Sequence, residues 1–152
     1  MSVIQSLFSQ LIKHTEAKYA VHRSFPLFSG LSNLELRLLD NILIERSYKP
    51  NELLFEETYP LEAVFLILEG EVKLEGKLPG LREKGEIIGL VDMFKDQFRS
   101  SSARATKNTR VWAVSRTDLL SLIDKNPRMG TKILTATCRY LGSHINEAST
   151  TD

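Results

Sequence analysis

Residues 47–114 form a succession of short β-rich runs separated by turn-forming pairs. Pairs such as Pro50-Asn51, Glu69-Gly70 and Pro79-Gly80 lie between the runs, where glycine, proline and asparagine favour turns. Many short strands at this spacing favour a small barrel or jelly roll over a parallel sheet. The predicted strands are Leu53–Phe55, Ala63–Leu68, Val72–Leu74, Ile87–Ile88, Ala103–Thr106 and Arg110–Val114.

Helical patterns flank this region on its N-terminal side. Apolar residues recur at three- and four-residue spacing through residues 3–22, which predicts one amphipathic helix that packs against the domain or a partner chain. Ser32 and Glu35 form a capping box, so a second helix is expected from about Asn33 to Leu43. The apolar positions of the first helix are Ile4, Leu7, Phe8, Leu11 and Ile12.

Two more helices are predicted on the C-terminal side. Ser115 and Asp118 form a second capping pattern, which opens a short helix through Asp124. Pro127 suits the first position of a longer helix that reaches about Asn146. The predicted organisation is therefore an N-terminal helix in 1–24, a domain in 25–146 with its barrel at about 47–114 and C-terminal helices at about 116–146, and a frayed tail in 147–152.

Composition excludes several classes of function. Lys and Arg total 20 and Asp and Glu total 19, so no net field attracts DNA or an anionic membrane. The single cysteine, Cys138, cannot form an internal disulfide, and its apolar helical neighbours predict that it packs as a small hydrophobic residue. The N-terminus lacks the pattern of a signal peptide and no apolar run is long enough to span a membrane, so we expect a cytoplasmic protein.

A metal centre is not expected either. Metal sites in barrels of this kind need histidines on the strands, and His14, His22 and His144 all lie outside the strand region. Asp92 and Asp96 have no nucleophile or base beside them, so no catalytic residue is assigned and we expect no enzyme.

The segment from Gly85 to Thr106 carries the most specific chemical signal. A glycine precedes a short apolar helix, an arginine follows ten residues later, and three serines lead into a strand. Backbone N–H groups at the start of a helix and a guanidinium are the donors that bind a phosphate. The candidate ligand-binding residues are Gly89, Leu90, Val91, Arg99, Ser100 and Ser101. Two simpler interpretations stay open: Arg99 as a surface cation that is solvated or paired with Asp92, Asp96 or Glu86, and the serines as a polar turn.

The same segment resembles the phosphate-binding cassette of cyclic-nucleotide-binding domains, the superfamily of catabolite activators and protein kinase A regulatory subunits. The resemblance runs from Phe25 to about Ile145 and includes Phe25-Pro26-Leu27-Phe28, Tyr48-Lys49-Pro50-Asn51-Glu52 and the run from Val64 to Leu74. It implies a mainly β fold with flanking helices, a double-stranded β-helix of jelly-roll type. Asn51 stands at a family glycine position, where asparagine tolerates the left-handed conformation. Thr58 and Leu61 also replace family glycines.

By position, the resemblance implies that Arg99 neutralises a cyclic phosphate and that Gly89 is the cassette glycine. The family's ribose-binding glutamate is replaced by Leu90, which cannot accept a hydrogen bond, and Phe98 replaces the usual proline. The missing acceptor would cost roughly 1–3 kcal/mol, a factor of ten to over a hundred in affinity. The expected ligand is cyclic AMP, cyclic GMP or another small phosphate-bearing anion, bound weakly or in an altered way.

Two functional hypotheses follow. The first is a regulatory module for signal transduction, in which a ligand on residues 89–99 changes the packing of the helix 127–146 and thereby signals to a protein partner or a homodimer. The second is a ligand-free structural, oligomerisation or docking domain with a degenerate pocket. The chain has no helix-turn-helix before Asp152, so sequence-specific DNA binding is not expected.

Overall fold

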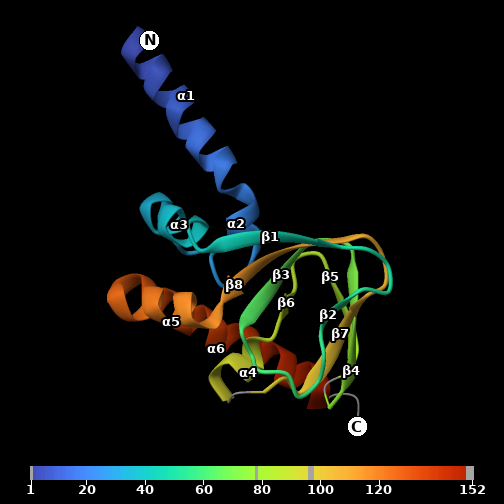
Figure 1. Ribbon diagram of the computed structural model, residues 1–152. Coiled ribbons are helices and arrows are strands. Elements are labelled where there is room, and N and C mark those ends of the chain that lie inside the picture. The colour runs from blue at the N-terminus through green and yellow to red at the C-terminus, as the bar shows by residue number, and fades with distance from the viewer. Residues whose placement is uncertain (1, 78, 96–97, 150–152) are drawn as a thin grey trace. The chain divides into compact units, whose positions relative to one another are not determined.

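The computed structural model describes residues 2–77, 79–95 and 98–149, and the chain divides into two compact units. Unit 1 consists of Met1–Asn41 and Lys125–Asp152, and unit 2 is the continuous segment Ile42–Asp124. Figure 1 labels the helices and strands of both units.

Unit 2 is built from two antiparallel four-stranded sheets, which confirms the jelly-roll-like fold with flanking helices (Figure 1). In the first sheet the strand order is β1-β8-β3-β6, and in the second it is β2-β7-β4-β5. Neighbouring strands are often far apart in sequence, as jelly-roll topology requires. The strands are β1 (Leu43–Tyr48), β2 (Leu53–Phe55), β3 (Ala63–Glu69), β4 (Glu71–Gly76), β5 (Gly80–Glu83), β6 (Ile87–Ile88), β7 (Ser101–Ala105) and β8 (Thr109–Ser115).

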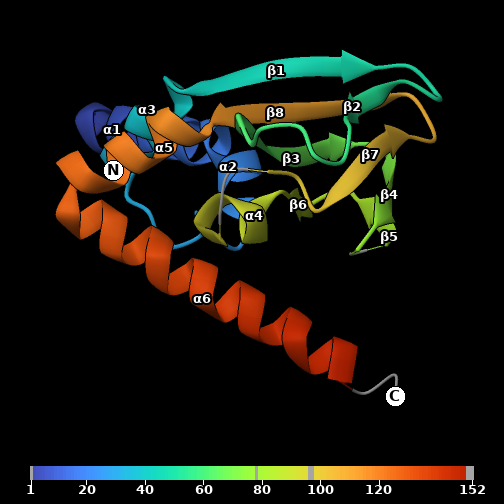
Figure 2. The same cartoon turned by 60° about the horizontal axis from the view of Figure 1, so that its bottom comes forward.

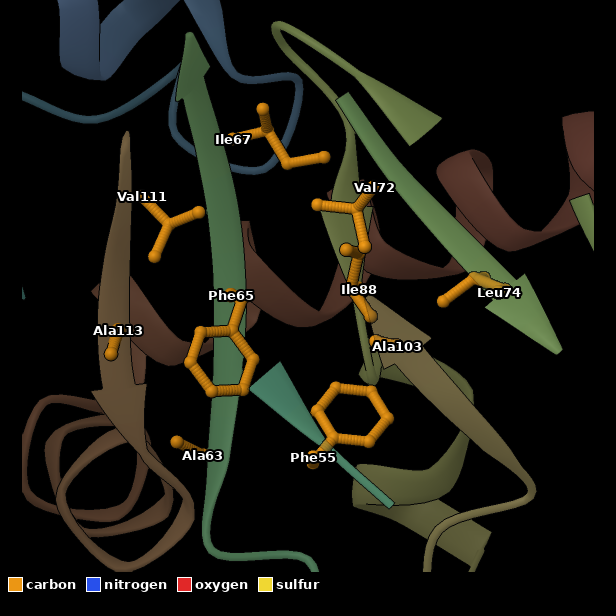
Figure 3. Close-up of a cluster of buried hydrophobic side chains, with 10 residues drawn as sticks. All are labelled: Phe55, Ala63, Phe65, Ile67, Val72, Leu74, Ile88, Ala103, Val111 and Ala113. Carbon is orange, nitrogen blue, oxygen red and sulfur yellow. The ribbon is translucent and has the colours of Figure 1, made fainter. Parts of the chain in front are cut away.

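The inward side chains of both sheets form one apolar core, drawn in Figure 3. Phe55 of β2 and Phe65 of β3 stack with their ring centroids 5.8 Å apart, so the two sheets meet at this pair. Small residues lie beside the rings: Ala63, Ala103 and Ala113 leave room for them. The core thus combines two large rings with small neighbours, which is how close packing is reached in a narrow barrel.

Two strands were not predicted, β1 and β5. β1 is exposed over its middle four residues, and its charged side chains hide the alternation that identifies a half-buried strand. A six-residue backbone ladder joins this edge strand to β8, and Arg110 of β8 adds an ion pair to Glu45 at 2.7 Å and one to Glu69 of β3 at 3.0 Å. β5 is short and has no buried residue. Neither strand therefore carries a clear hydrophobic pattern.

The expected single helix over residues 3–22 is two helices, α1 (Val3–Lys18) and α2 (Ala20–Ser24). Tyr19 separates them with φ −106° and ψ 12°, and its side chain is buried against the ring of His22. Burial of this aromatic residue stops the helix where the periodicity alone would continue it. The apolar stripe of α1 is exposed, including Ile4, Leu7 and Phe8.

The remaining helices begin close to where their caps were predicted. The Ser32–Glu35 capping box is present at the start of α3 (Asn33–Asp40), although β1 then begins at Leu43. The backbone N–H of Asp118 donates to Ser115 Oγ at the start of α5 (Arg116–Lys125). α6 (Pro127–Ser149) is one uninterrupted helix (Figure 2). It extends into the predicted tail, of which residues 150–152 lie outside the described residues.

Cys138 on α6 is exposed, so the prediction that it packs as a small hydrophobic residue is wrong. Searched over the described ranges, none of the helices is long and apolar enough to cross a membrane.

Candidate functional site

The predicted cassette lies in unit 2, where Gly89 joins β6 to the short helix α4 (Leu90–Lys95). Gly89 has φ +91°, a conformation that residues with a side chain rarely adopt. A Cβ built at this position would lie 2.6 Å from Nη1 of Arg99. Glycine is therefore required at position 89 for two reasons: the backbone conformation there is strained for other residues, and a side chain would collide with Arg99.

Arg99 is folded into the barrel and is only 4% exposed. Its Nη2 donates to the carbonyl oxygen of Ala63 at 2.6 Å, and its guanidinium carbon lies 3.8 Å from the ring centroid of Phe55. Within the described ranges, Nε and Nη1 are buried and have no hydrogen-bond partner. The interpretation of Arg99 as a solvated surface cation is therefore wrong.

Burial also changes the electrostatics of this side chain. Removal from water lowers the pKa of Arg99 to about 10, while the negative charges of Asp92 and Glu62 act in the opposite direction. The guanidinium thus stays charged at neutral pH, and a buried charge with spare donors favours a compensating anion.

Backbone hydrogen bonds to the segment after β2 hold the backbone of Arg99 in place. Its N–H donates to the carbonyl of Tyr59 at 2.9 Å, and its carbonyl accepts from the N–H of Thr58 at 3.2 Å. Thr58 has φ +74° and Asn51 has φ +73°, so two of the three replacements of family glycines keep the left-handed conformation, whereas Leu61 does not. For the β-branched Thr58 this conformation is strained.

The other candidate residues lie near Arg99 in sequence but make different contacts. Ser100 is bound to Asp92, which accepts from its hydroxyl at 2.8 Å and from its N–H at 3.1 Å. Leu90 is buried at 3% exposure, whereas Val91 is 39% exposed. Ser101 is buried at the start of β7. The structure thus brings Gly89 and Arg99 into contact, and Ser100 links the residue after Arg99 to Asp92 of α4. Asp96, one alternative ion partner of Arg99, lies outside the described residues.

Phe55 and Ala63 belong to this site but were not predicted as parts of it. Both were predicted as strand residues, and neither has a chemical group that identifies a binding site by itself. The contact joins Phe55 to an arginine far from it in the sequence, so no local pattern signals it. Across the described segments, no three His, Cys, Asp or Glu side chains cluster in a way that could hold a metal ion.

Comparison with known proteins agrees with this architecture. The family profile of the cyclic nucleotide-binding domain matches residues 45–126, more than half of the chain. The chain belongs to the cyclic nucleotide-binding domain family.

Two relatives match over most of this chain. The chain is 28% identical to the cyclic AMP receptor protein of Thermus thermophilus over 76% of its own length and 57% of that protein. It is 26% identical to a protein of Rhodopseudomonas palustris named as a potassium channel protein, over 88% of its own length and 34% of that protein. The chain therefore spans about a third to somewhat over half of these relatives.

A solved structure supports the same fold. The cyclic nucleotide-binding domain from Methylobacillus flagellatus superposes with a TM-score of 0.74 at 27% identity. The match covers 89% of this chain and 80% of that domain.

Proposed function

We propose that this domain is a regulatory module in which Arg99 binds the phosphate of a cyclic nucleotide or of another small phosphate-bearing anion. The observation that carries the proposal is the buried guanidinium, two of whose nitrogens have no hydrogen-bond partner among the described residues. An unsatisfied buried donor costs free energy, and an anion that accepts from it removes this cost. The family membership and the likeness to the cyclic AMP receptor protein support the same ligand class.

Leu90 weakens this binding at the ribose. A buried leucine offers no acceptor to a sugar hydroxyl, which would lose its bonds to water on binding. The phosphate contacts of Arg99 do not depend on Leu90. The proposed site therefore keeps affinity for the phosphate and discriminates little in favour of a ribose hydroxyl.

Output passes from the ligand to a protein partner or a second copy through α6, as a change in the packing of that helix. Two arrangements of the helix with different ligand affinities suffice for such a switch.

Isothermal titration calorimetry of the intact chain with cyclic AMP and cyclic GMP tests the proposal. We expect saturable binding in the high-micromolar range or tighter, and at least tenfold weaker binding by the Arg99→Gln variant because a charged donor is lost. Arg82→Gln is the matched control, since Arg82 on β5 donates only to the carbonyl of its neighbour Leu81 among its described contacts. Equal loss in both variants, or no heat at millimolar nucleotide, would overturn the proposal for these ligands.

Restoring an acceptor at residue 90 tests the second part. We expect Leu90→Glu to tighten binding of cyclic AMP about tenfold or more, with some loss of stability because a carboxylate replaces a buried leucine. Leu90→Met is the control, because it keeps the volume and adds no comparable acceptor. A 2′-deoxy cyclic nucleotide should not gain from Leu90→Glu, and a similar gain for both ligands would contradict the role of the ribose.

One observation favours a second candidate function, a structural domain without a ligand. Phe55 and the carbonyl of Ala63 already contact the guanidinium, as expected of a site that no longer binds a ligand. In that case the Arg99 variants and the wild-type protein would be alike in every titration.

A further inference from the structure

We propose that a groove in unit 1 binds an acidic peptide segment of a partner protein. The groove is a cavity of about 550 Å³ between the loop after α2 and one face of α6. Volumes of this size hold a small ligand or a few residues of a peptide. All its lining residues belong to unit 1, so it is separate from the Arg99 site of unit 2.

The charge of the residues that line the groove favours an anionic partner. Among the described residues that line the groove, two are cations, Lys132 and Arg139, and none is a carboxylate. Lys132 is already engaged, because its Nζ lies 2.6 Å from Glu35 Oε1. Arg139 is exposed and has no hydrogen bond or ion pair to another described residue. Its guanidinium is thus available for the two-pronged binding of a carboxylate.

The hydroxyl groups favour a peptide over an inorganic anion. Ser29, Thr131 and Ser143 each donate their hydroxyl hydrogen to a backbone carbonyl of their own segment, at 3.2, 2.8 and 2.8 Å. Their oxygens therefore remain mainly as acceptors, which suit the N–H groups of a peptide backbone and offer nothing to a phosphate or sulfate. Pro26, Leu27 and Ala136 supply apolar surface for neighbouring side chains.

The groove also stays open when α6 associates through its apolar stripe. Leu134, Cys138, Leu141 and Ile145 recur at four- and three-residue spacing, which places them on one side of the helix. At about 100° per residue, Lys132, Arg139 and Ser143 lie roughly opposite that stripe. A peptide in the groove and a second copy on the stripe do not compete.

Nuclear magnetic resonance titration of the whole 152-residue chain tests the proposal. The probes are acetyl-Leu-Glu-Leu-N-methylamide and its neutral counterpart, acetyl-Leu-Gln-Leu-N-methylamide. We expect saturable shifts of the amides of Thr131, Ala136 and Arg139 with the acidic probe, a dissociation constant below about 1 mM, and about tenfold weaker binding of the neutral probe. Equal binding of the two probes, or no shift at 10 mM (about ten times that constant), would overturn it.

Two variants with matched controls complete the test. Arg139→Gln should weaken the acidic probe about tenfold, whereas Arg128→Gln, an exposed α6 cation outside the groove, should not. A Cβ at Gly30 would meet nothing within 4 Å, so Gly30→Leu should fold and obstruct the groove, with Gly142→Leu as the control outside it. Unaltered binding in both Arg139→Gln and Gly30→Leu would contradict the site. Groove shifts that depend on protein concentration without peptide would instead identify a second copy as its occupant and overturn the proposal. None of these outcomes depends on binding at Arg99.

Discussion

Gly89 and Gly85 offer a direct comparison at the scale of single residues. Both have a positive φ, +91° and +90°, but a Cβ at Gly85 would meet nothing within 4 Å, whereas one at Gly89 would collide with Arg99 Nη1. The backbone cost of alanine is therefore similar at the two sites, about 1–2 kcal/mol. The difference between the two variants isolates the close approach of the arginine.

We expect Gly89→Ala to be more destabilising than Gly85→Ala by roughly 1–2 kcal/mol, because the guanidinium must leave its place on Phe55 and Ala63 or strain the glycine segment. Urea denaturation of both variants measures this difference. Only Gly89→Ala should also weaken nucleotide binding in calorimetry. Equal stability of the two variants would mean that the guanidinium moves aside at no cost.

Among the elements, α3 and α6 are linked by the pair Glu35–Lys132 within unit 1. Burial by itself raises the pKa of the Glu35 carboxyl, but hydrogen bonds from Lys132 and from the Ser32 cap outweigh it, so the pKa lies below its ordinary value of 4.5. A lowered pKa means that the charged carboxylate stabilises the fold above pH 4.5. This contribution is lost as the pH falls through the folded-state pKa.

Glu35→Gln keeps the capping hydrogen bond and removes the charge. We expect a loss of about 0.5–1 kcal/mol at pH 7, typical of a partly exposed pair, that disappears in acid. Denaturation at pH 7 and at a pH well below 4.5 measures both values, with the exposed Glu16→Gln as the control for a charge change. The same loss at both pH values would show that the carboxylate charge contributes nothing.

The elements also show what sequence alone could predict. Six strands and the caps at Ser32 and Ser115 were predicted near their observed places, because alternating burial and capping depend on local sequence. β1 was missed because its four middle residues are exposed and show no alternating hydrophobic pattern, and because its backbone ladder to β8 joins segments far apart in the sequence. The break at Tyr19 was missed because tertiary burial, not a helix-breaking residue, causes it.

The candidate site could be predicted only in part for the same reason. The pairing of Gly89 with Arg99 followed from the family motif. The stacking of Phe55 on the guanidinium and the contact with Ala63 depend on how two sheets meet, and no local pattern encodes that.

For the whole molecule, the exposed apolar stripe of α6 predicts self-association. Leu134 and Ile145 are 38% and 67% exposed, and Cys138 between them is exposed too. When two helices pair along an apolar stripe of this spacing, the side chains of the stripe become buried between them. We propose a homodimer through this stripe, as the route by which one copy responds to the ligand of the other.

Sedimentation velocity tests this expectation. The wild-type chain should show a concentration-dependent dimer, and the Leu134→Glu/Ile145→Glu double variant should remain monomeric because two like charges would face each other across the paired stripes. Ser143→Glu on the opposite side of α6 is the control and should still dimerise. A monomeric wild type at 100 μM, a concentration typical of such a measurement, would contradict the dimer, since it implies a dissociation constant of roughly that size or weaker.

The burial of Arg99 has a consequence for the speed of binding. Among the described residues its two spare nitrogens, Nε and Nη1, are closed off from water, so neighbouring groups must move apart before an anion can reach their hydrogens. Capture of the ligand then has a step whose rate does not rise with ligand concentration. In a stopped-flow experiment the observed rate would climb and then level off, and the plateau would report how often the barrel opens.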